Sequence, residues 1–346
     1  MMSDDGPANE SNVGARPTGA AGNQRHQQAE KALWDADALL RERQPSITPD
    51  VQTSGMSLKA GTAVQKGEPS RTALHVAQLR AVHQLLDDPI VLTDPVALPI
   101  LGPRMEASLR EDPFRLNDPI SRGVRAGLVA RSRFAEDELS KAVDDGIRQY
   151  VILGAGLDTF AYRNPHENAG LNVFEVDHPS TQQSKRQCLS DAGIAVPATV
   201  HFVPVDFEHG SLSGQLENAG LRSDLPTCFS WMGVSVYLSQ QAVLDTLSYV
   251  AAQPSGSRIS FDYRVPMSLL NPIERVIVGI MDQQVAASGE PWISSFDPAL
   301  MQHQLRELGF SFIDDPGPDA INSRYFSRRK DALSCGSVFR FVSARV

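Results

Sequence analysis

A short apolar run that leads directly into two closely spaced glycines is the feature that most constrains the fold of this chain. Residues 150–153 form this run, and Gly154 and Gly156 follow at once. A second apolar run, residues 172–176, ends at Asp177. Apolar runs bounded by glycine are typical of buried parallel strands, and glycine lets a ligand approach the backbone. The stretch predicts a nucleoside site in which Asp177 accepts hydrogen bonds from the ribose hydroxyls.

The residues after the second glycine indicate which nucleoside is bound. The dinucleotide-binding fingerprint has a third glycine where this chain has Thr159, and bulky Phe160 and Tyr162 follow. The turn is therefore a poor binding site for a pyrophosphate. S-adenosylmethionine carries no phosphate and needs only the close turn and the ribose acid. An ordinary strand–helix–strand unit, whose glycines serve packing alone, remains an alternative.

Several separated blocks resemble the leucine carboxyl methyltransferase family, specifically its bacterial O-methyltransferase branch. The resemblance starts with VILGAGLDTFAYR and FEVDHP around the two strands and extends over residues 70–346. The other blocks are SRTALHVAQLRA (70–81), VARSRFAEDEL (129–139), PVDFE (204–208), SWMGVSVYLS (230–239) and the closing RYFSRR and FRFVSARV. It implies an α/β class I methyltransferase fold: a Rossmann-like, mostly parallel sheet with one antiparallel strand.

The hydrophobic periodicity predicts the elements and their division into regions. We expect a disordered tail at 1–55 and a methyltransferase domain at 56–346, in which a helical lid (56–146) precedes a Rossmann-like core (147–346) with an insertion at 266–296. The predicted strands are 150–153, 172–176, 200–205, 227–231, 258–262, 310–313 and 338–343. The predicted helices are 70–86, 118–146, one from about 159, 179–192, 211–219, 240–252, 270–287 and 297–308.

Composition excludes several other classes. The net charge of −9 argues against a nucleic-acid-binding protein, which needs a basic face. The three cysteines have neither disulfide nor zinc spacing, so no metal is expected. The sequence contains no run of eighteen apolar residues, so we expect no membrane helix. The polar N-terminus lacks the apolar segment of a secretory signal. We therefore expect a cytoplasmic protein, and the sequence does not indicate its oligomeric state.

The resemblance implies further contacts to S-adenosylmethionine. An acid after the third strand, Asp206, would accept the adenine amino group, and the amide of Phe207 would meet a ring nitrogen. Arg131 and Arg71 match two basic positions that approach the carboxylate of the methionine part, and an arginine fork suits a carboxylate. Arg133 lies close enough to be confused with Arg131. A solvated helix face or loop is the alternative role for these residues.

One position departs from the family pattern, and the acceptor side is less defined. Many members have a glutamate, which contacts the amino end of the cofactor, where this chain has Met232. A carboxylate acceptor needs no base, whereas a hydroxyl needs one. The catalytic candidates are Tyr237, Tyr263 and Arg264, with Asp262, His303, Arg324 and Tyr325 as further polar side chains; no base is identified among them.

These observations together predict an S-adenosylmethionine-dependent O-methyltransferase. The methyl acceptor is expected to be a carboxylate or hydroxyl of a small molecule, with secondary metabolites among the candidates. One alternative is a non-catalytic S-adenosylmethionine-binding protein, which the Met232 departure motivates. Another is an NAD-dependent oxidoreductase, against which Thr159 and the separated blocks argue.

Overall fold

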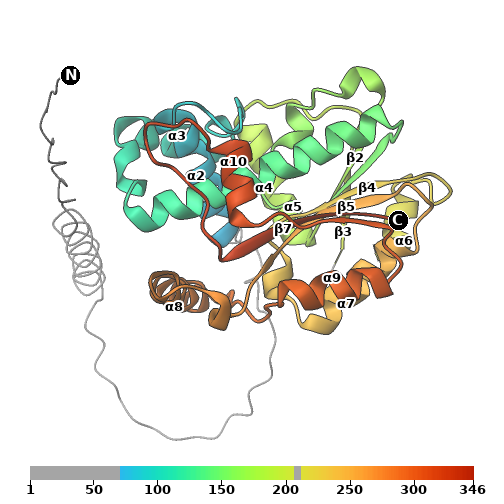
Figure 1. Ribbon diagram of the computed structural model, residues 1–346. Coiled ribbons are helices and arrows are strands. Elements are labelled where there is room, and N and C mark those ends of the chain that lie inside the picture. The colour runs from blue at the N-terminus through green and yellow to red at the C-terminus, as the bar shows by residue number, and fades with distance from the viewer. Residues whose placement is uncertain (1–70, 206–211) are drawn as a thin grey trace, which may run out of the picture. The chain divides into compact units, whose positions relative to one another are not determined.

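A single seven-stranded sheet, covered by helices on both faces, forms the centre of the structure (Figure 1). The computed structural model describes residues 71–205 and 212–346. The strand order is β3-β2-β1-β4-β5-β7-β6, and β7 runs antiparallel to both of its neighbours. This confirms the predicted fold class. The strands are β1 (Gln149–Leu153), β2 (Asn172–Asp177), β3 (Val200–Pro204), β4 (Cys228–Trp231), β5 (Arg258–Arg264), β6 (Phe312–Asp314) and β7 (Phe339–Arg345).

The inner strands read as continuous apolar runs because helices bury them from both sides. Every residue of β1, β4 and β5 is buried. One face packs against α6 (Leu212–Asn218), α7 (Gln240–Ala251) and α9 (Pro298–Glu307). The other face packs against α4 (Pro119–Asp144) and α5 (Pro179–Asp191), and α10 (Pro318–Tyr325) joins α4 over β7. This double cover leaves the carboxyl ends of the parallel strands as the place for a ligand.

Of the helices that precede the sheet, α2 (Arg71–Leu86) packs on α4. The others, α3 (Pro103–Glu111) and the short 3-10 helices η1 (Pro99–Leu101) and η2 (Pro113–Leu116), pack on α2. Asp118 caps α4 by accepting hydrogen bonds of 3.0 Å from the amides of Ile120 and Ser121, as an N-cap acid does. The predicted helices at 70–86 and 118–146 are confirmed. The lid role of this region remains a prediction, and the predicted tail at 1–55 lies outside the described residues.

The helix predicted from residue 159 is wrong. The chain there forms only two 3-10 turns, η3 (Phe160–Tyr162) and η4 (Glu167–Ala169). The hydroxyl of buried Thr159 donates to Asp94 at 2.6 Å, and Pro165 disfavours a helical Asn164. A tertiary hydrogen bond and a proline thus outweigh the local helical pattern.

Two helices were not predicted, α3 and α10, and each begins with a proline in its first turn. The remaining elements are η5 (Ser235–Tyr237), η6 (Met267–Leu269) and α8 (Pro272–Ala287), of which the last two belong to the predicted insertion. Within the described ranges, no helix is both long and apolar enough to cross a membrane.

A buried ion pair joins α5 to β2, on the face of the sheet that α4 and α5 cover. Lys185 Nζ lies 2.7 Å from Glu175 Oε2, and both side chains are only 1% exposed. The hydroxyl of Tyr162 donates to the same carboxylate at 3.0 Å. Burial raises the pKa of Glu175, and Lys185 opposes that rise.

We predict that Lys185→Met lowers the free energy of unfolding at pH 7 by about 3–5 kcal/mol, because it leaves Glu175 buried and unpaired. Loss of the lysine raises the folded-state pKa of Glu175 further, so the deficit shrinks as the pH falls and the carboxyl takes up a proton. Urea unfolding at two pH values measures both effects. Lys185→Met combined with Glu175→Gln should recover most of the loss; an equal deficit in the double variant would contradict the pairing argument.

Candidate functional site

The turn after β1 is bound to the end of β2. The amides of Gly154 and Ala155 both donate to the carbonyl of Val176, at 2.8 and 3.0 Å. The amide of Gly156 donates to Asp177 Oδ2 at 2.5 Å. The structure therefore brings together the two predicted glycines and the predicted ribose acid at the carboxyl ends of β1 and β2.

Both glycines are required by backbone conformation. Their φ angles are +68° at Gly154 and +46° at Gly156, in the left-handed region that favours glycine. A Cβ atom at position 154 would lie 2.4 Å from Cγ2 of Val234, which follows β4. At position 156 the nearest atom would be Cβ of Ala73 in α2, at an ordinary 3.6 Å. The turn is thus enclosed by the loop after β4 and by the first turn of α2.

Asp177 keeps acceptor capacity for a ligand. Each carboxylate oxygen accepts one backbone amide, Oδ2 from Gly156 and Oδ1 from His178 at 2.7 Å. An ionised carboxylate offers about four lone-pair sites, so the contacts within residues 71–205 and 212–346 leave about two open. Burial raises the pKa of Asp177, and the two amides oppose that rise in part.

A buried polar cluster fixes the chain that follows the turn. Asp94, which is 1% exposed, accepts from Thr159 and lies 3.0 Å from Arg80 Nε and 3.3 Å from Arg163 Nε. Arg80 also donates to the carbonyl of Leu157 at 2.5 Å. Position 159, which lacks the glycine of the dinucleotide fingerprint, therefore serves to attach the turn to α2. Sequence reasoning missed this cluster, although the acid within a proline-rich loop offered a weak signal.

Arg131 lies at the carboxyl ends of β4 and β5. Its Nη1 donates to Asp262 Oδ2 at 3.1 Å, and Asp262 Oδ1 accepts the amide of Gly233 at 2.6 Å. Arg133, by contrast, is half-exposed and pairs with Asp137 on the same helix. The structure thus separates the two arginines: Arg131 points to the strand ends, and Arg133 faces outward.

The other predicted cofactor residues are less defined. Arg71 is exposed at the first residue of α2, two positions before Ala73, which faces the glycine turn. Asp206 and Phe207 lie outside the described residues. Met232 is partly buried and packs against an apolar cluster of α4, α10 and β7 that includes Phe134 and Phe341.

Of the three catalytic candidates, Tyr237 alone has Arg131 as a neighbour. Burial raises its pKa, and its neighbours Trp292 and Arg131 oppose that rise in part. The tyrosine therefore stays protonated at neutral pH. The chain around Trp292 is attached to the loop after β4, because the amide of Ile293 donates to the carbonyl of Val236 at 2.7 Å.

Tyr263 and Arg264 have other partners. The hydroxyl of Tyr263 donates to Asp315 at 3.0 Å, and its ring packs in the core on the opposite face of the sheet from α4. Arg264 forms two hydrogen bonds to Asp282 of α8, at 2.9 and 2.8 Å, and lies 5.2 Å from the ring centroid of Trp292. Arg264 thus attaches the insertion to β5. Of the remaining polar candidates, Tyr325 donates to Asp137, Arg324 lies 3.9 Å from Asp314, and His303 is exposed on α9.

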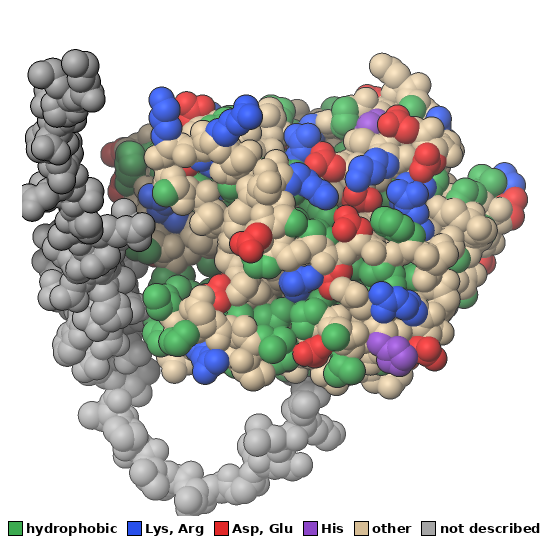
Figure 2. Space-filling view, viewed as in Figure 1, with side chains coloured by type: hydrophobic (Ala, Val, Ile, Leu, Met, Phe, Trp, Pro, Cys, Tyr) green, Lys and Arg blue, Asp and Glu red, His purple; other side chains and the backbone are tan. Residues whose placement is uncertain are grey.

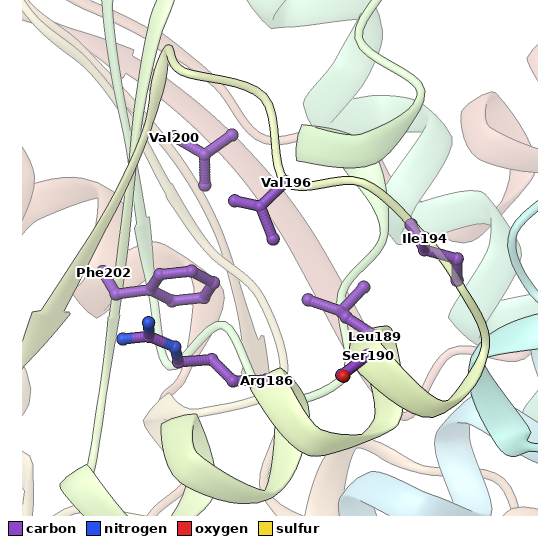
Figure 3. Close-up of a pocket in the computed structure, with 7 residues that line it drawn as sticks. All are labelled: Arg186, Leu189, Ser190, Ile194, Val196, Val200 and Phe202. Carbon is purple, nitrogen blue, oxygen red and sulfur yellow. The ribbon is translucent and has the colours of Figure 1, made fainter.

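A cavity of about 500 Å³ lies elsewhere, between α5 and the edge strand β3 (Figure 3). Its lining includes Leu189, Val196, Val200 and Phe202, with Arg186 stacked over the ring of Phe202 at 5.0 Å. Val200 begins β3, so the cavity lies toward the amino end of that strand. Ligands of parallel sheets bind at the carboxyl ends, and we therefore place the candidate site at the glycine turn.

Charge on the surface is mixed. Figure 2 shows Lys and Arg side chains interspersed with Asp and Glu over the visible face. Apolar side chains gather toward the lower left, where Figure 1 places α8. Ile273 and Val276 of that helix are about half-exposed.

The sequence matches known proteins over most of its length. A profile of the leucine carboxyl methyltransferase family matches residues 73–251. YktD of Bacillus subtilis, named as an S-adenosyl-L-methionine-dependent methyltransferase, is 32% identical over 307 residues, which cover 81% of this chain and 99% of that protein. Rv3399 of Mycobacterium tuberculosis, named in the same way, is 31% identical over 331 residues, 92% of this chain and 86% of that protein.

A solved structure has the same fold. A methyltransferase structure from Thermobifida fusca superposes with a TM-score of 0.50 at 18% identity, over 83% of this chain and 97% of that one. At this identity the likeness supports the class I methyltransferase fold.

We predict that Gly154→Ala destabilises the protein more than Gly170→Ala. Both positions have positive φ angles, +68° and +75°, but a Cβ at 170 meets nothing within 4 Å. The conformational cost of about 1–2 kcal/mol is therefore shared, and contact with Val234 adds about 1–3 kcal/mol at position 154. Thermal or urea unfolding measures the difference. Gly154→Ala combined with Val234→Ala should remove the added part, and equal costs at the two glycines would refute the contact.

Proposed function

The chain belongs to the leucine carboxyl methyltransferase family and is an S-adenosylmethionine-dependent methyltransferase, and we propose that it methylates an oxygen of a small molecule. The observation that carries this proposal is that Asp177 binds the glycine turn and that the loop after β4 joins this turn to Arg131, because Val234 lies against Gly154 and Gly233 against the guanidinium. Three different parts of the cofactor can be held there. Asp177 can hold the ribose, the backbone of the turn can hold the atoms between the ribose and the amino acid part, and Arg131 can hold the carboxylate.

The described residues fit this cofactor. Asp177 has lone pairs beyond those used by its two amides, and Arg131 uses one of its five N–H donors for Asp262. A positive-φ turn without a third glycine suits a ligand that has no pyrophosphate. By the same proposal, Asp206 and Phe207 meet the adenine, and Arg71 is a second partner for the carboxylate. The helices α2 to α4 then cover the bound cofactor.

S-adenosylmethionine, when bound, supplies an electrophilic methyl group on a sulfonium. The protein must hold the acceptor oxygen in line with that methyl group and exclude water from both. Transfer forms an O–C bond and breaks an S–C bond, whose electron pair stays on sulfur. A carboxylate acceptor becomes an ester without losing a proton, whereas a hydroxyl acceptor must lose one.

A carboxylate is the acceptor that the described site supports better. Tyr237 stays protonated because burial raises its pKa, so it can donate a hydrogen bond to an acceptor but is a poor base. Asp262 is committed to Arg131 and Gly233. Trp292 and Phe339, whose rings pack edge to face at 5.4 Å, offer an apolar wall beside Tyr237. We propose secondary metabolites as the substrate class and the cytoplasm as the location.

We predict that Asp177→Ala weakens binding of S-adenosylmethionine about tenfold to hundredfold, because hydrogen bonds to a charged group contribute about 1.5–3 kcal/mol. Calorimetric titration measures the affinity, with exposed Asp191→Ala as the control that should bind like the wild type. A parallel titration with NAD should show no binding. Binding of NAD alone would overturn the proposed function. Tight S-adenosylmethionine binding, without turnover on any of a panel of carboxylic acids and phenols, would favour the non-catalytic alternative.

The pH dependence of binding should reflect Asp177. Burial raises its pKa above the usual 3.8, so protonation begins at a higher pH than for an exposed aspartate. We predict that affinity for methylthioadenosine, which lacks the amino acid part, is constant near neutral pH and falls as the pH approaches the raised pKa. Titrations over a pH series measure this decline, which should be absent in Asp177→Ala. A decline of the same size in that variant would assign the effect to another group.

A further inference from the structure

Asp262 is a buried carboxylate that lies between two groups at the strand ends. Its side chain is 1% exposed, in a strand of which every residue is buried. Oδ1 accepts the amide of Gly233 at 2.6 Å, and Oδ2 accepts Nη1 of Arg131 at 3.1 Å. Its own backbone carbonyl accepts the hydroxyl of Ser235 at 2.6 Å. The residue therefore connects α4 to the loop after β4.

The guanidinium of Arg131 occupies a space that only glycine leaves open. A Cβ atom at position 233, where φ is +76°, would lie 2.5 Å from Nη2 and 2.8 Å from both Cζ and Nη1. Gly233 thus lets the guanidinium rest against the backbone, and the amide of the same residue holds the carboxylate that binds it. The position of Arg131 is set by two residues that are distant from it in sequence.

Arg131 needs such support because its side chain is long and partly exposed. Its side chain is 16% exposed, and Asp262 is its only hydrogen-bond partner among residues 71–205 and 212–346. A released arginine regains rotamer freedom, which a bound anion must then remove again. A prepositioned guanidinium avoids that cost.

We propose that Asp262 is a positioning residue, which holds Arg131 in the orientation that receives the carboxylate of S-adenosylmethionine. This inference rests on the proposed function, in which Arg131 binds that carboxylate. Asp262 acts through Arg131 and contributes only indirectly to affinity.

Asp262 also neutralises Arg131 and competes with a bound anion. If this competition dominated, Asp262 would weaken the binding of S-adenosylmethionine. Two contacts argue for positioning instead. The second oxygen of Asp262 is fixed by the Gly233 amide, so the carboxylate stays in place. Asp262 takes up one of the five N–H donors of Arg131, which leaves the other donors for a ligand. Loss of a competitor would strengthen binding, whereas loss of a positioning group weakens it, so the sign of the change decides.

The experiment compares binding of S-adenosylmethionine and of methylthioadenosine by calorimetric titration in four variants. They are Asp262→Asn, Arg131→Met, the double variant and Asp315→Asn. Asp315 is the matched control, since its side chain is also 1% exposed and pairs with an arginine, Arg340, that is 18% exposed. Asp315 follows β6, two strands away from β5, and accepts the hydroxyl of Tyr263, which packs on the face of the sheet opposite α4.

We expect Asp262→Asn to weaken S-adenosylmethionine about tenfold and to leave methylthioadenosine unchanged, which a general loss of structure would not do. Arg131→Met should give a similar or larger selective loss, and the double variant should bind no more weakly than Arg131→Met, because the two residues act as one unit. Asp315→Asn should bind both ligands like the wild type. If Asp262→Asn does not fold, Gly233→Ala provides a second route, because its Cβ displaces the guanidinium without removing the acid.

The outcomes separate the two levels of the argument. If Arg131→Met leaves S-adenosylmethionine binding intact, the assignment of Arg131 in the proposed function fails. If Arg131→Met weakens binding but Asp262→Asn strengthens it, leaves it unchanged, or adds independently to the arginine effect, the positioning role is overturned and the proposed function stands. An equal loss for both ligands in Asp262→Asn would also overturn it.

Discussion

The hydrogen bonds from the turn after β1 to the end of β2 are the interaction on which the site depends. The Val176 carbonyl accepts two successive amides, and Asp177 accepts a third. These bonds hold the turn in a left-handed conformation that only glycine adopts at low cost. As a result, the backbone of one strand end and the carboxylate of the next face the same space, which is the requirement for holding a nucleoside.

The surroundings of this turn are held by buried charges as well as by apolar contacts. Asp94 binds Thr159 and two arginines, and Asp262 binds Arg131, both with almost no exposure to water. Such groups are costly to bury unless paired, so they contribute little net stability but penalise any other arrangement. We interpret them as devices for placing α2 and α4 accurately over the strand ends, where an error in geometry would separate the binding groups.

Much of the fold was predictable because it depends on local pattern. Apolar runs ending in glycine or acid gave strands close to the observed ones, and Asp118 marked the start of α4. The helix expected from residue 159 was wrong, since a hydrogen bond from Thr159 to a residue 65 positions away decides that segment. Short proline-initiated α3 and α10 escaped prediction because they carry too few residues for a clear periodicity.

The sequence alone determined the alternation of strands and helices, the glycine turn and the acid that ends β2, because each depends on the conformational or polar character of single residues. Only the tertiary structure decided which arginine faces the strand ends. Arg131 and Arg133 are chemically identical and two positions apart, yet one pairs with Asp262, 131 positions away, and the other with its own helix. Likewise, Tyr263 and Arg264 acquired other partners through packing. A side chain's type fixes what it can bind, whereas the neighbours that folding supplies fix what it does bind.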